Sequence, residues 1–157
     1  MNRHINHEGH EEFEGHEVKQ SGTTGHRVRV PSPLSANAER AMSETIGCAI
    51  RVHRELGPGF LESIYRKAMC VELETSGLSY EAERPVLVRY RHASISGQRV
   101  DLIVESPIVV ELKSVTHLDK VHLAQVISYL RTTGLRGGLL INFRVPVLRH
   151  GLRRVVL

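Results

Sequence analysis

Apolar residues recur at intervals of three and four in the first part of the chain and closer to every second position later, which predicts helices followed by strands. A first helix is expected to begin near Ala38, with Ser35 or Asn37 as its N-cap, and to end at Gly57-Pro58-Gly59. A second helix is expected over residues 60–76. The residues expected on the inner faces are Ala38, Met42, Ile46, Ala49, Ile50 and His53 in the first helix and Leu61, Ile64, Tyr65, Ala68, Met69 and Leu73 in the second.

The pattern changes to strand spacing after Pro85. Three strands are expected over residues 86–91, 98–105 and 108–113, with turns at Ser96-Gly97 and Ser106-Pro107. Helical spacing returns over residues 118–132, and two further segments follow: an interior strand at 138–143 and a strand or short helix at 147–156. A three-stranded meander, one crossover helix and a return strand predict an α/β sandwich with a mixed sheet.

The first 37 residues differ from the rest in composition. Residues 7–17 consist mainly of His, Glu and Gly, and such a segment has too little apolar surface to offset the entropy of ordering. We therefore expect a disordered tail over residues 1–37 and one folded domain over residues 38–157.

Composition narrows the class of protein. The chain has 157 residues, 41% of them apolar and 24% charged, which is ordinary for a globular domain. No apolar run approaches the ~20 residues of a membrane-spanning helix, and no apolar stretch follows the N-terminus as in a secretory signal. Two cysteines, Cys48 and Cys70, fit a reducing compartment, so we expect a cytoplasmic protein without a membrane partner.

The formal net charge of +4 is distributed unevenly. Residues 1–37 have a net charge of −1 and the remaining 120 residues have +5, and no acidic residue follows Asp119. Two interpretations of this pattern are open: a basic face that is only solvated, or a surface that attracts phosphates. The candidate nucleic-acid contacts in this quarter of the chain are Arg131, Arg136, Arg144 and Arg149.

Charged residues interrupt two of the apolar strands. Glu111 and Lys113 lie two residues apart, so both side chains project from the same face of a strand, and Asp101 interrupts the strand before it. If the two strands form a hairpin around Ser106-Pro107, Asp101 and Glu111 are equidistant from the turn and converge. Two carboxylates beside a lysine suit Mg²⁺, although a buried ion pair would explain the same residues.

Helical neighbours add further polar candidates. Glu62 and Tyr65 share a face of the second helix, where Glu62 could serve a site or complement the helix dipole. Gln125 and Tyr129 share a face of the third predicted helix. His122 could approach the same region, but a solvated or satisfied histidine explains it equally.

The segment from Gly59 to Tyr65 fits the signature of the GxxExxY proteins, a group similar to the PD-(D/E)XK nuclease superfamily. Asp101, the segments 110–115 and 124–130, and the segment 138–143 resemble that family in the same order, over roughly residues 40–145. The resemblance implies a restriction-endonuclease-like α-β-β-β-α-β core with a mixed central sheet flanked by helices, here with an extra N-terminal helix.

The resemblance also implies roles for single residues. Asp101, Glu111 and the main-chain carbonyl of Leu112 would bind Mg²⁺ or Mn²⁺, and Lys113 would position or activate the attacking water. Glu62 would complete the metal site and Gln125 would support it, while Gly59, Tyr65 and Tyr129 belong to the supporting motifs. Val100 precedes Asp101 where the family motif has proline.

These residues predict a metal-dependent endo- or exonuclease that hydrolyses phosphodiester bonds in nucleic acid, with DNA favoured over RNA. Small enzymes of this fold often cut two strands as dimers, which allows for a homodimer, although no patch of the sequence is assigned to its interface. The alternative is a non-catalytic module of the same fold that binds nucleic acid or protein, because fold and motif do not establish a reaction.

Overall fold

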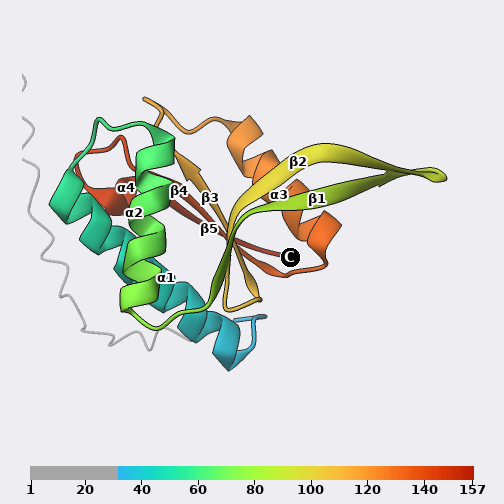
Figure 1. Ribbon diagram of the computed structural model, residues 1–157, viewed down its shortest axis with the longest axis horizontal. Helices are drawn as coiled ribbons and strands as arrows, with labels where there is room; N and C mark the ends of the chain where they lie inside the picture. Colours follow the sequence, from blue (N-terminus) through green and yellow to red (C-terminus); the bar gives the residue numbers. More distant parts are fainter. Residues whose placement is uncertain (1–31) are drawn as a thin grey trace, which may run out of the picture. The chain divides into compact units, whose positions relative to one another are not determined.

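Among residues 32–157 of this computed structural model, five strands form one mixed sheet in the order β1-β2-β3-β4-β5 (Figure 1). Their bounds are β1 Tyr80–Tyr90, β2 Ala93–Val104, β3 Ile108–Lys113, β4 Gly137–Asn142 and β5 Leu152–Val156. β3 and β4 are parallel and every other neighbouring pair is antiparallel. Parallel neighbours need a crossover connection, which α3 (Lys120–Thr133) provides. The predicted mixed α/β architecture is therefore confirmed.

The structure describes residues 32–157, and Ser32–Leu157 form one compact unit. Most of the tail predicted over residues 1–37 lies outside the described residues, which begin at position 32. The disordered tail and its boundary with the domain therefore stay predictions. Within the described part of the chain, no helix is both long and apolar enough to cross a membrane.

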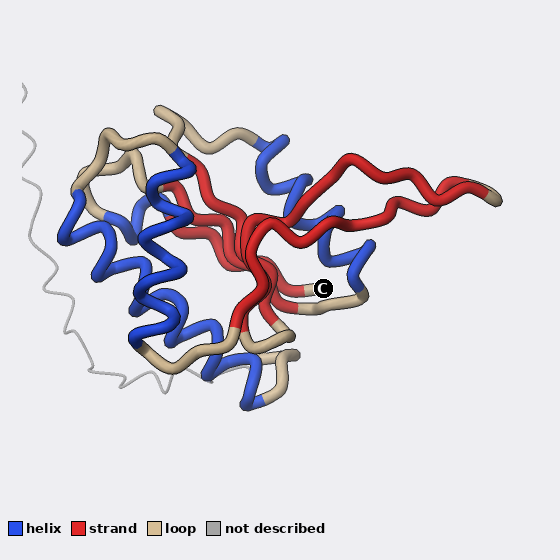
Figure 2. The backbone as a smooth tube through the Cα atoms, viewed as in Figure 1, coloured by secondary structure: helices blue, strands red, loops and turns tan. Residues whose placement is uncertain are grey.

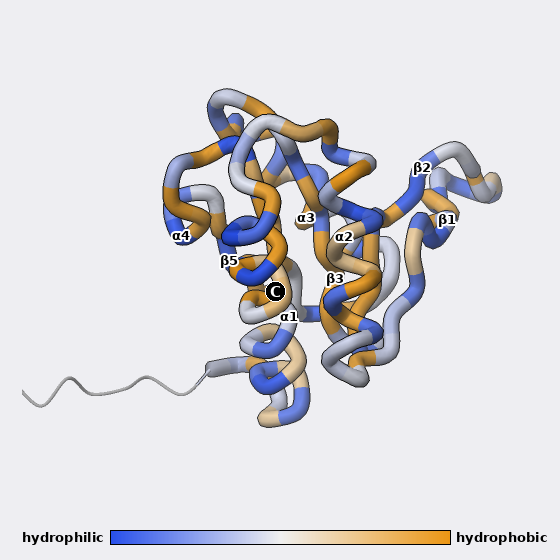
Figure 3. The backbone as a smooth tube through the Cα atoms, turned by 60° about the vertical axis from the view of Figure 1, so that its left-hand side comes forward, coloured by the Kyte–Doolittle hydropathy of each residue, from blue (hydrophilic) through white to orange (hydrophobic). Residues whose placement is uncertain are grey.

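Helices cover both faces of the sheet. The helices α1 (Ala36–Leu56) and α2 (Glu62–Thr75) pack on one face, and α3 packs on the other. Side chains that alternate along β4 join the two cores, since Leu139 belongs to the α1–α2 cluster and Leu140 to the α3 cluster. The apolar strand β3 lies between these layers (Figure 3).

The N-terminal helices differ in part from their predicted faces. Ser35 is the N-cap of α1, and its hydroxyl accepts a hydrogen bond from the Ala38 N–H at 3.2 Å. Ile50, predicted on the inner face, is 41% exposed. Leu61 and Ile64 were also predicted to face inward, but they are 74% and 39% exposed. Leu61 precedes the first helical residue, so it is not part of the inner face that buries Tyr65, Met69 and Leu73.

The turn of the β1–β2 hairpin lies at a different position from the predicted one. The chain reverses at Arg91 and His92 rather than at Ser96-Gly97, which lie inside β2. Gly97 has φ +119°, and the strand register shifts nearby. A glycine within a strand commonly marks such a bulge, so it was misread as a turn. The end of the hairpin projects away from the sheet (Figures 1 and 2).

The C-terminal segment contains both of the elements that the sequence left open. A short helix, α4 (Leu148–Gly151), is followed at once by β5. β5 pairs antiparallel with β4 and forms the edge of the sheet opposite β1. The central strands β3 and β4 are thereby covered on both sides and along both edges.

Candidate active site

The candidate site lies where β2 and β3 separate. Their last recorded pair is Leu102 with Val110, and one further step in the same register would place Asp101 opposite Glu111. The Asp101 carboxylate instead accepts a hydrogen bond from the Leu112 N–H, with 2.9 Å between Oδ2 and N. Asp101 therefore closes the end of the ladder with its side chain, and the two strands diverge beyond it.

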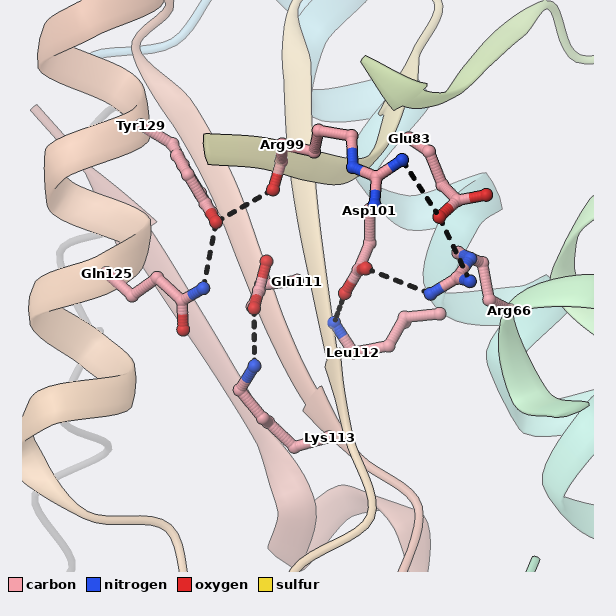
Figure 4. A network of polar contacts seen from close by, with 9 residues as sticks. All are labelled: Arg66, Glu83, Arg99, Asp101, Glu111, Leu112, Lys113, Gln125 and Tyr129. Carbon is pink, nitrogen blue, oxygen red and sulfur yellow. Dashed lines mark hydrogen bonds and ion pairs between the residues drawn. The ribbon is translucent and has the colours of Figure 1, made fainter. Parts of the chain in front are cut away.

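Glu111 and Lys113 project from β3 toward the α3 side of the sheet. Glu111 is two residues from Val109, which belongs to the α3 cluster, so both share one face. Only 3% of Glu111 is exposed, and its carboxylate forms an ion pair with the Lys113 ammonium (Figure 4). The ion pair compensates a charge that would otherwise be costly to bury in this strand.

The helix α2 brings a second basic group to the site, where it pairs with Asp101. Arg66 Nη1 lies 3.4 Å from Asp101 Oδ1, and Arg66 Nη2 lies 3.3 Å from Glu83 Oε1 (Figure 4). The end of β3 is tied to the start of α2, because the Ser114 hydroxyl donates to the Phe60 carbonyl at 2.7 Å. This contact helps to hold the first turn of α2 next to the site.

Gly59 and Tyr65 shape the loop that precedes Glu62. Gly59 has φ +125°, a conformation that favours glycine. The buried Tyr65 hydroxyl donates to the Gly57 carbonyl at 2.6 Å and accepts from the Phe60 N–H at 3.1 Å. The spacing of the Gly, Glu and Tyr residues in the motif therefore has a structural cause, since the glycine and the tyrosine set the point at which the helix begins with Glu62.

The helix α3 supports the site from the face of the sheet opposite to α2. Gln125 Nε2 donates to the Tyr129 hydroxyl at 2.8 Å, and that hydroxyl donates to the Arg99 carbonyl at 2.8 Å (Figure 4). Arg99 lies two residues before Asp101, so this chain of hydrogen bonds fixes the β2 backbone beside it. His122 has a local role, because its Nδ1 accepts a hydrogen bond from the Asp119 N–H at the start of α3.

The carboxylates of the site repel one another. Burial, followed by the charge of Asp101, raises the pKa of Glu111 to about 7, although Lys113 acts in the opposite direction. Burial also raises the pKa of Glu62, and the charge of Asp101 adds to the shift. Burial and the charge of Asp101 therefore both favour the protonated forms of Glu111 and Glu62.

Lys113 stays protonated in this environment. Burial alone would lower its pKa, but the hydrogen bond and charge of Glu111, with the charges of Glu62 and Asp101, outweigh burial and raise it. Burial and the charges of Glu111 and Asp101 likewise raise the pKa of Tyr129, so its hydroxyl keeps its proton.

The donor atoms fit a hard divalent cation. Within residues 32–157, no group of three or more His, Cys, Asp or Glu side chains is gathered closely enough to hold a metal ion. Asp101 and Glu111 instead bond to Arg66, Lys113 and the Leu112 N–H. Carboxylate oxygens are nevertheless the type of ligand that Mg²⁺ prefers. A bound cation would also offset the burial and the repulsion by Asp101 that raise the pKa of Glu111.

The four basic residues predicted to contact nucleic acid do not lie together. Arg144 follows β4 at the end where Asn142 pairs with Lys113, whereas Arg136 precedes β4 at its opposite end and donates to the Leu157 carbonyl. Arg149 lies on α4, and Arg131 lies in the last turn of α3. They are distributed around the sheet and do not form one patch.

Arg66 is the contact that the sequence analysis missed. It follows Glu62 by four residues and so shares its helix face, which was the available signal. Glu83 and the Arg99 side chain extend the network beyond Arg66, with 3.9 Å between Arg99 Nη1 and Glu83 Oε1. Glu83 is in a left-handed conformation with φ +50°, and no sequence pattern indicated its position.

A mixed sheet covered by helices on both faces, with acids and a lysine on two adjoining strands, defines a restriction-endonuclease-like α/β domain. A comparison with known families matches residues 39–155 to the PD-(D/E)XK nuclease superfamily, and the chain belongs to that superfamily. The predicted superfamily and fold are thereby confirmed. No curated protein and no solved structure matches the chain.

Proposed function

We propose that this protein is a metal-dependent nuclease that hydrolyses phosphodiester bonds in DNA. The observation that supports this most is the fork between β2 and β3, where Asp101, Glu111 and Lys113 come from two adjoining strands. Burial there, followed by the charge of Asp101, raises the pKa of Glu111 to about 7. Membership in a nuclease superfamily makes nucleic acid the expected substrate class.

The carboxylates of Asp101 and Glu111 and the Leu112 carbonyl are the groups that would hold Mg²⁺ or Mn²⁺, with Glu62 as a further ligand. Such a cation, when bound, lowers the pKa of water and neutralises charge on the scissile phosphate. The protonated Lys113 would orient the attacking water or donate a hydrogen bond to a phosphate oxygen. Glu62 lies close enough to Lys113 and Asp101 for their charges to influence its pKa.

Gln125 and Tyr129 act in this proposal as positioning residues. Their hydrogen bonds end at the Arg99 carbonyl, so they hold the backbone two residues from Asp101. We also assign the chain to the GxxExxY group, which the geometry of Gly59, Glu62 and Tyr65 supports. A homodimer would allow two strands of a duplex to be cut together.

Cleavage by charge-removing variants tests the proposal. Asp101→Asn keeps the size of the side chain and an acceptor for the Leu112 N–H but removes the charge, and Lys113→Met removes the ammonium. Each is expected to lower Mg²⁺-dependent cleavage of a DNA panel by about a hundredfold or more. The panel contains single-stranded, duplex and branched DNA with RNA alongside, each with Mg²⁺, Mn²⁺ or chelator.

The matched controls are exposed residues of the same charge outside the site. Glu55→Gln on α1 and Lys120→Met at the start of α3 remove the same charges and should cut at the parent's rate. Parental cleavage by Asp101→Asn or Lys113→Met would overturn the assignment of these residues.

A non-catalytic module is the second candidate, and one observation favours it. Asp101 and Glu111 each already have a basic partner, Arg66 and Lys113. A protein that used these pairs only for stability would bind no cation at this site. Titration calorimetry with Mn²⁺ distinguishes the two, because binding that Asp101→Asn abolishes supports the nuclease, whereas the absence of binding supports the module.

A further inference from the structure

The outer part of the β1–β2 hairpin, residues 84–100, is strongly basic. It contains Arg84, Arg89, Arg91 and Arg99 and no aspartate or glutamate. Its formal charge of +4 equals that of the entire chain. We call this segment the arm. It was not among the basic candidates in the sequence analysis, which lie after residue 119.

The arm projects from the domain. Val86 is the last buried residue on the outgoing strand, and every residue from Leu87 to Gly97 is exposed. Four residues of strand separate Val86 from Tyr90, so the arm extends about 13 Å beyond the core. Its projection is visible in Figures 1 and 2, where the hairpin end lies clear of all helices.

Two arginines of the arm are available for a partner. Arg84 and Arg99 form ion pairs with Glu81 and Glu83, at 3.2 and 3.9 Å. Arg89 and Arg91, in contrast, have no acidic partner among residues 32–157. The Arg91 guanidinium lies over the Tyr90 ring, 5.5 Å from its centre, which orders it at the turn.

A groove beside the arm adds a third arginine. Leu87, Val88 and Arg89 of β1 and Arg131 and Thr132 of α3 line a hollow of about 290 Å³. Arg89 and Arg131 therefore belong to two different elements but border one space. Arg131, an isolated candidate in the sequence, thereby becomes part of the surface at the root of the arm.

We infer that the arm, with Arg131 at its root, binds the phosphate backbone of double-stranded DNA by laying its two-stranded ribbon along a groove. A ribbon of two strands fits the wide major groove of B-form DNA, whereas the major groove of an RNA helix is too narrow for it. Single-stranded nucleic acid is bound mainly by stacking on aromatic side chains, and Tyr90 is the one aromatic residue between positions 84 and 100 apart from His92.

This inference rests on the proposed function and specifies its substrate. β2 contains both the second strand of the arm and Asp101, and Gly97 is only four residues, about 13 Å, from Asp101. A duplex held on the arm would therefore lie within reach of the site. Because the contacts are to phosphates, the arm contributes affinity without reading the base sequence.

The apolar side of the arm offers an alternative occupant. Val88 pairs with Ile95 across the hairpin, and Tyr90 lies two residues further along on the same side. These exposed side chains could instead contact a second copy of the chain. The charge on the arm argues against that occupant, since two arms of the same sign repel one another.

The test is binding of a labelled DNA duplex to the full chain, measured by fluorescence anisotropy in chelator over a series of salt concentrations. Arg89→Ala/Arg91→Ala should weaken binding by roughly tenfold and reduce the slope of log affinity against log salt by about two, one for each phosphate contact. Arg89→Lys/Arg91→Lys keeps both charges and should bind within about twofold of the parent.

The matched control is the double variant Arg54→Ala/Lys67→Ala, which removes two exposed positive charges on α1 and α2. It should bind the duplex as the parent does. Equal binding by the parent and the arm variant overturns the inference, as does a parent that binds no duplex at low salt. An arm variant that changes the oligomeric state in light scattering but not DNA binding shows that the arm contacts a second copy and also overturns it.

A cleavage assay with the same variants distinguishes failure of the inference about the arm from failure of the proposed nuclease activity. If the arm variant binds duplex weakly and the parent cuts nothing, the inference stands and the proposed nuclease fails. If the parent cuts and the arm variant binds and cuts equally well, the nuclease stands and the inference fails.

Discussion

Glu111 is a single buried acid whose ionisation affects the stability of the domain. It lies on a strand whose other members, from Ile108 to Leu112, are apolar and buried. Burial and the charge of Asp101 raise its pKa to about 7, so near neutral pH the protonated and ionised forms coexist. Its ordinary pKa in the unfolded chain is near 4.5, which makes the stability of the domain depend on pH.

The sign of that dependence follows from the two pKa values. Because folding raises the pKa, the folded state binds the proton more tightly, and its contribution to stability is present below about pH 4.5 and lost as the pH rises through about 7. In chelator, the loss attributable to Glu111 is expected to reach roughly 3 kcal/mol. Urea unfolding of the parent at several pH values between 5 and 8 measures it.

Glu111→Gln serves as the comparison, because glutamine has the same size but no ionisable group. Its free energy of unfolding should vary less with pH over the same interval. A variant whose pH profile parallels that of the parent would show that other groups cause the dependence.

Single residues also show where sequence reasoning works. Charges inside apolar strands are visible in the sequence, because alternation and burial are local properties and a charge violates both. The partner of Asp101 was not visible in this way. Arg66 comes from another element 35 residues earlier, and its approach depends on how α2 packs across the sheet.

At the level of elements, two glycines differ in the space that the fold leaves for a side chain. Gly47 lies inside α1, and an added Cβ would meet only Arg51 Nη1, at 3.6 Å. Gly151 ends α4, and its Cβ would lie 2.1 Å from the carbonyl oxygen of Asn142. One site has room for a methyl group, and the other is closed by the backbone of β4.

Alanine at these two positions is expected to change stability in opposite directions. Gly47→Ala should raise the free energy of unfolding by about 0.5–1 kcal/mol, because alanine restricts the unfolded chain and favours a helix. Gly151→Ala should lower it by about 3 kcal/mol, since backbone cannot yield as a flexible side chain does. Chemical denaturation of both variants beside the parent measures the difference, and a destabilised Gly47→Ala or a neutral Gly151→Ala would contradict it.

The hairpin is the element that the sequence described least well. Ser96-Gly97 has the composition of a turn, yet Gly97 lies in β2 and the chain reverses at Arg91 and His92. A bulge and a turn use the same residue types, so composition alone does not separate them. The length of the paired strands, which decides how far the arm projects, therefore emerged only from the structure.

At the level of the molecule, one sheet joins two hydrophobic cores. Leu139 and Leu140 are adjacent on β4 and each is 1% exposed, but they belong to different clusters on opposite faces. Because adjacent residues of one strand contribute to both, neither core can be lost without disturbing the strand that supports the other. The described domain is therefore expected to unfold as one cooperative unit.

Truncation of either leucine tests this coupling. Leu139→Ala and Leu140→Ala should each lower the free energy of unfolding by about 2–5 kcal/mol, and each should still unfold in a single transition. Far-ultraviolet circular dichroism and tyrosine fluorescence are suitable probes, since the chain has no tryptophan and Tyr65 and Tyr129 lie in separate clusters. Midpoints that differ between the two probes would show that the cores unfold independently.

The sequence by itself determined the order of the elements up to β4, the mixed sheet and the placement of Asp101 and Glu111 at matching distances from one turn. Each of these follows from periodicity and from pairing between strands that are neighbours in the chain, where the physical constraints are local. The superfamily resemblance rested on the same local segments and is confirmed over residues 39–155.

Only the tertiary structure decided which distant groups meet. Arg66 reaches Asp101, the Tyr129 hydroxyl reaches the Arg99 carbonyl, and Arg131 shares a groove with Arg89. These contacts join elements that pack through the sheet, and their geometry depends on crossing angles, strand twist and the bulge near Gly97. Such quantities arise from the packing of the entire domain, because no short segment contains both partners of any of these contacts.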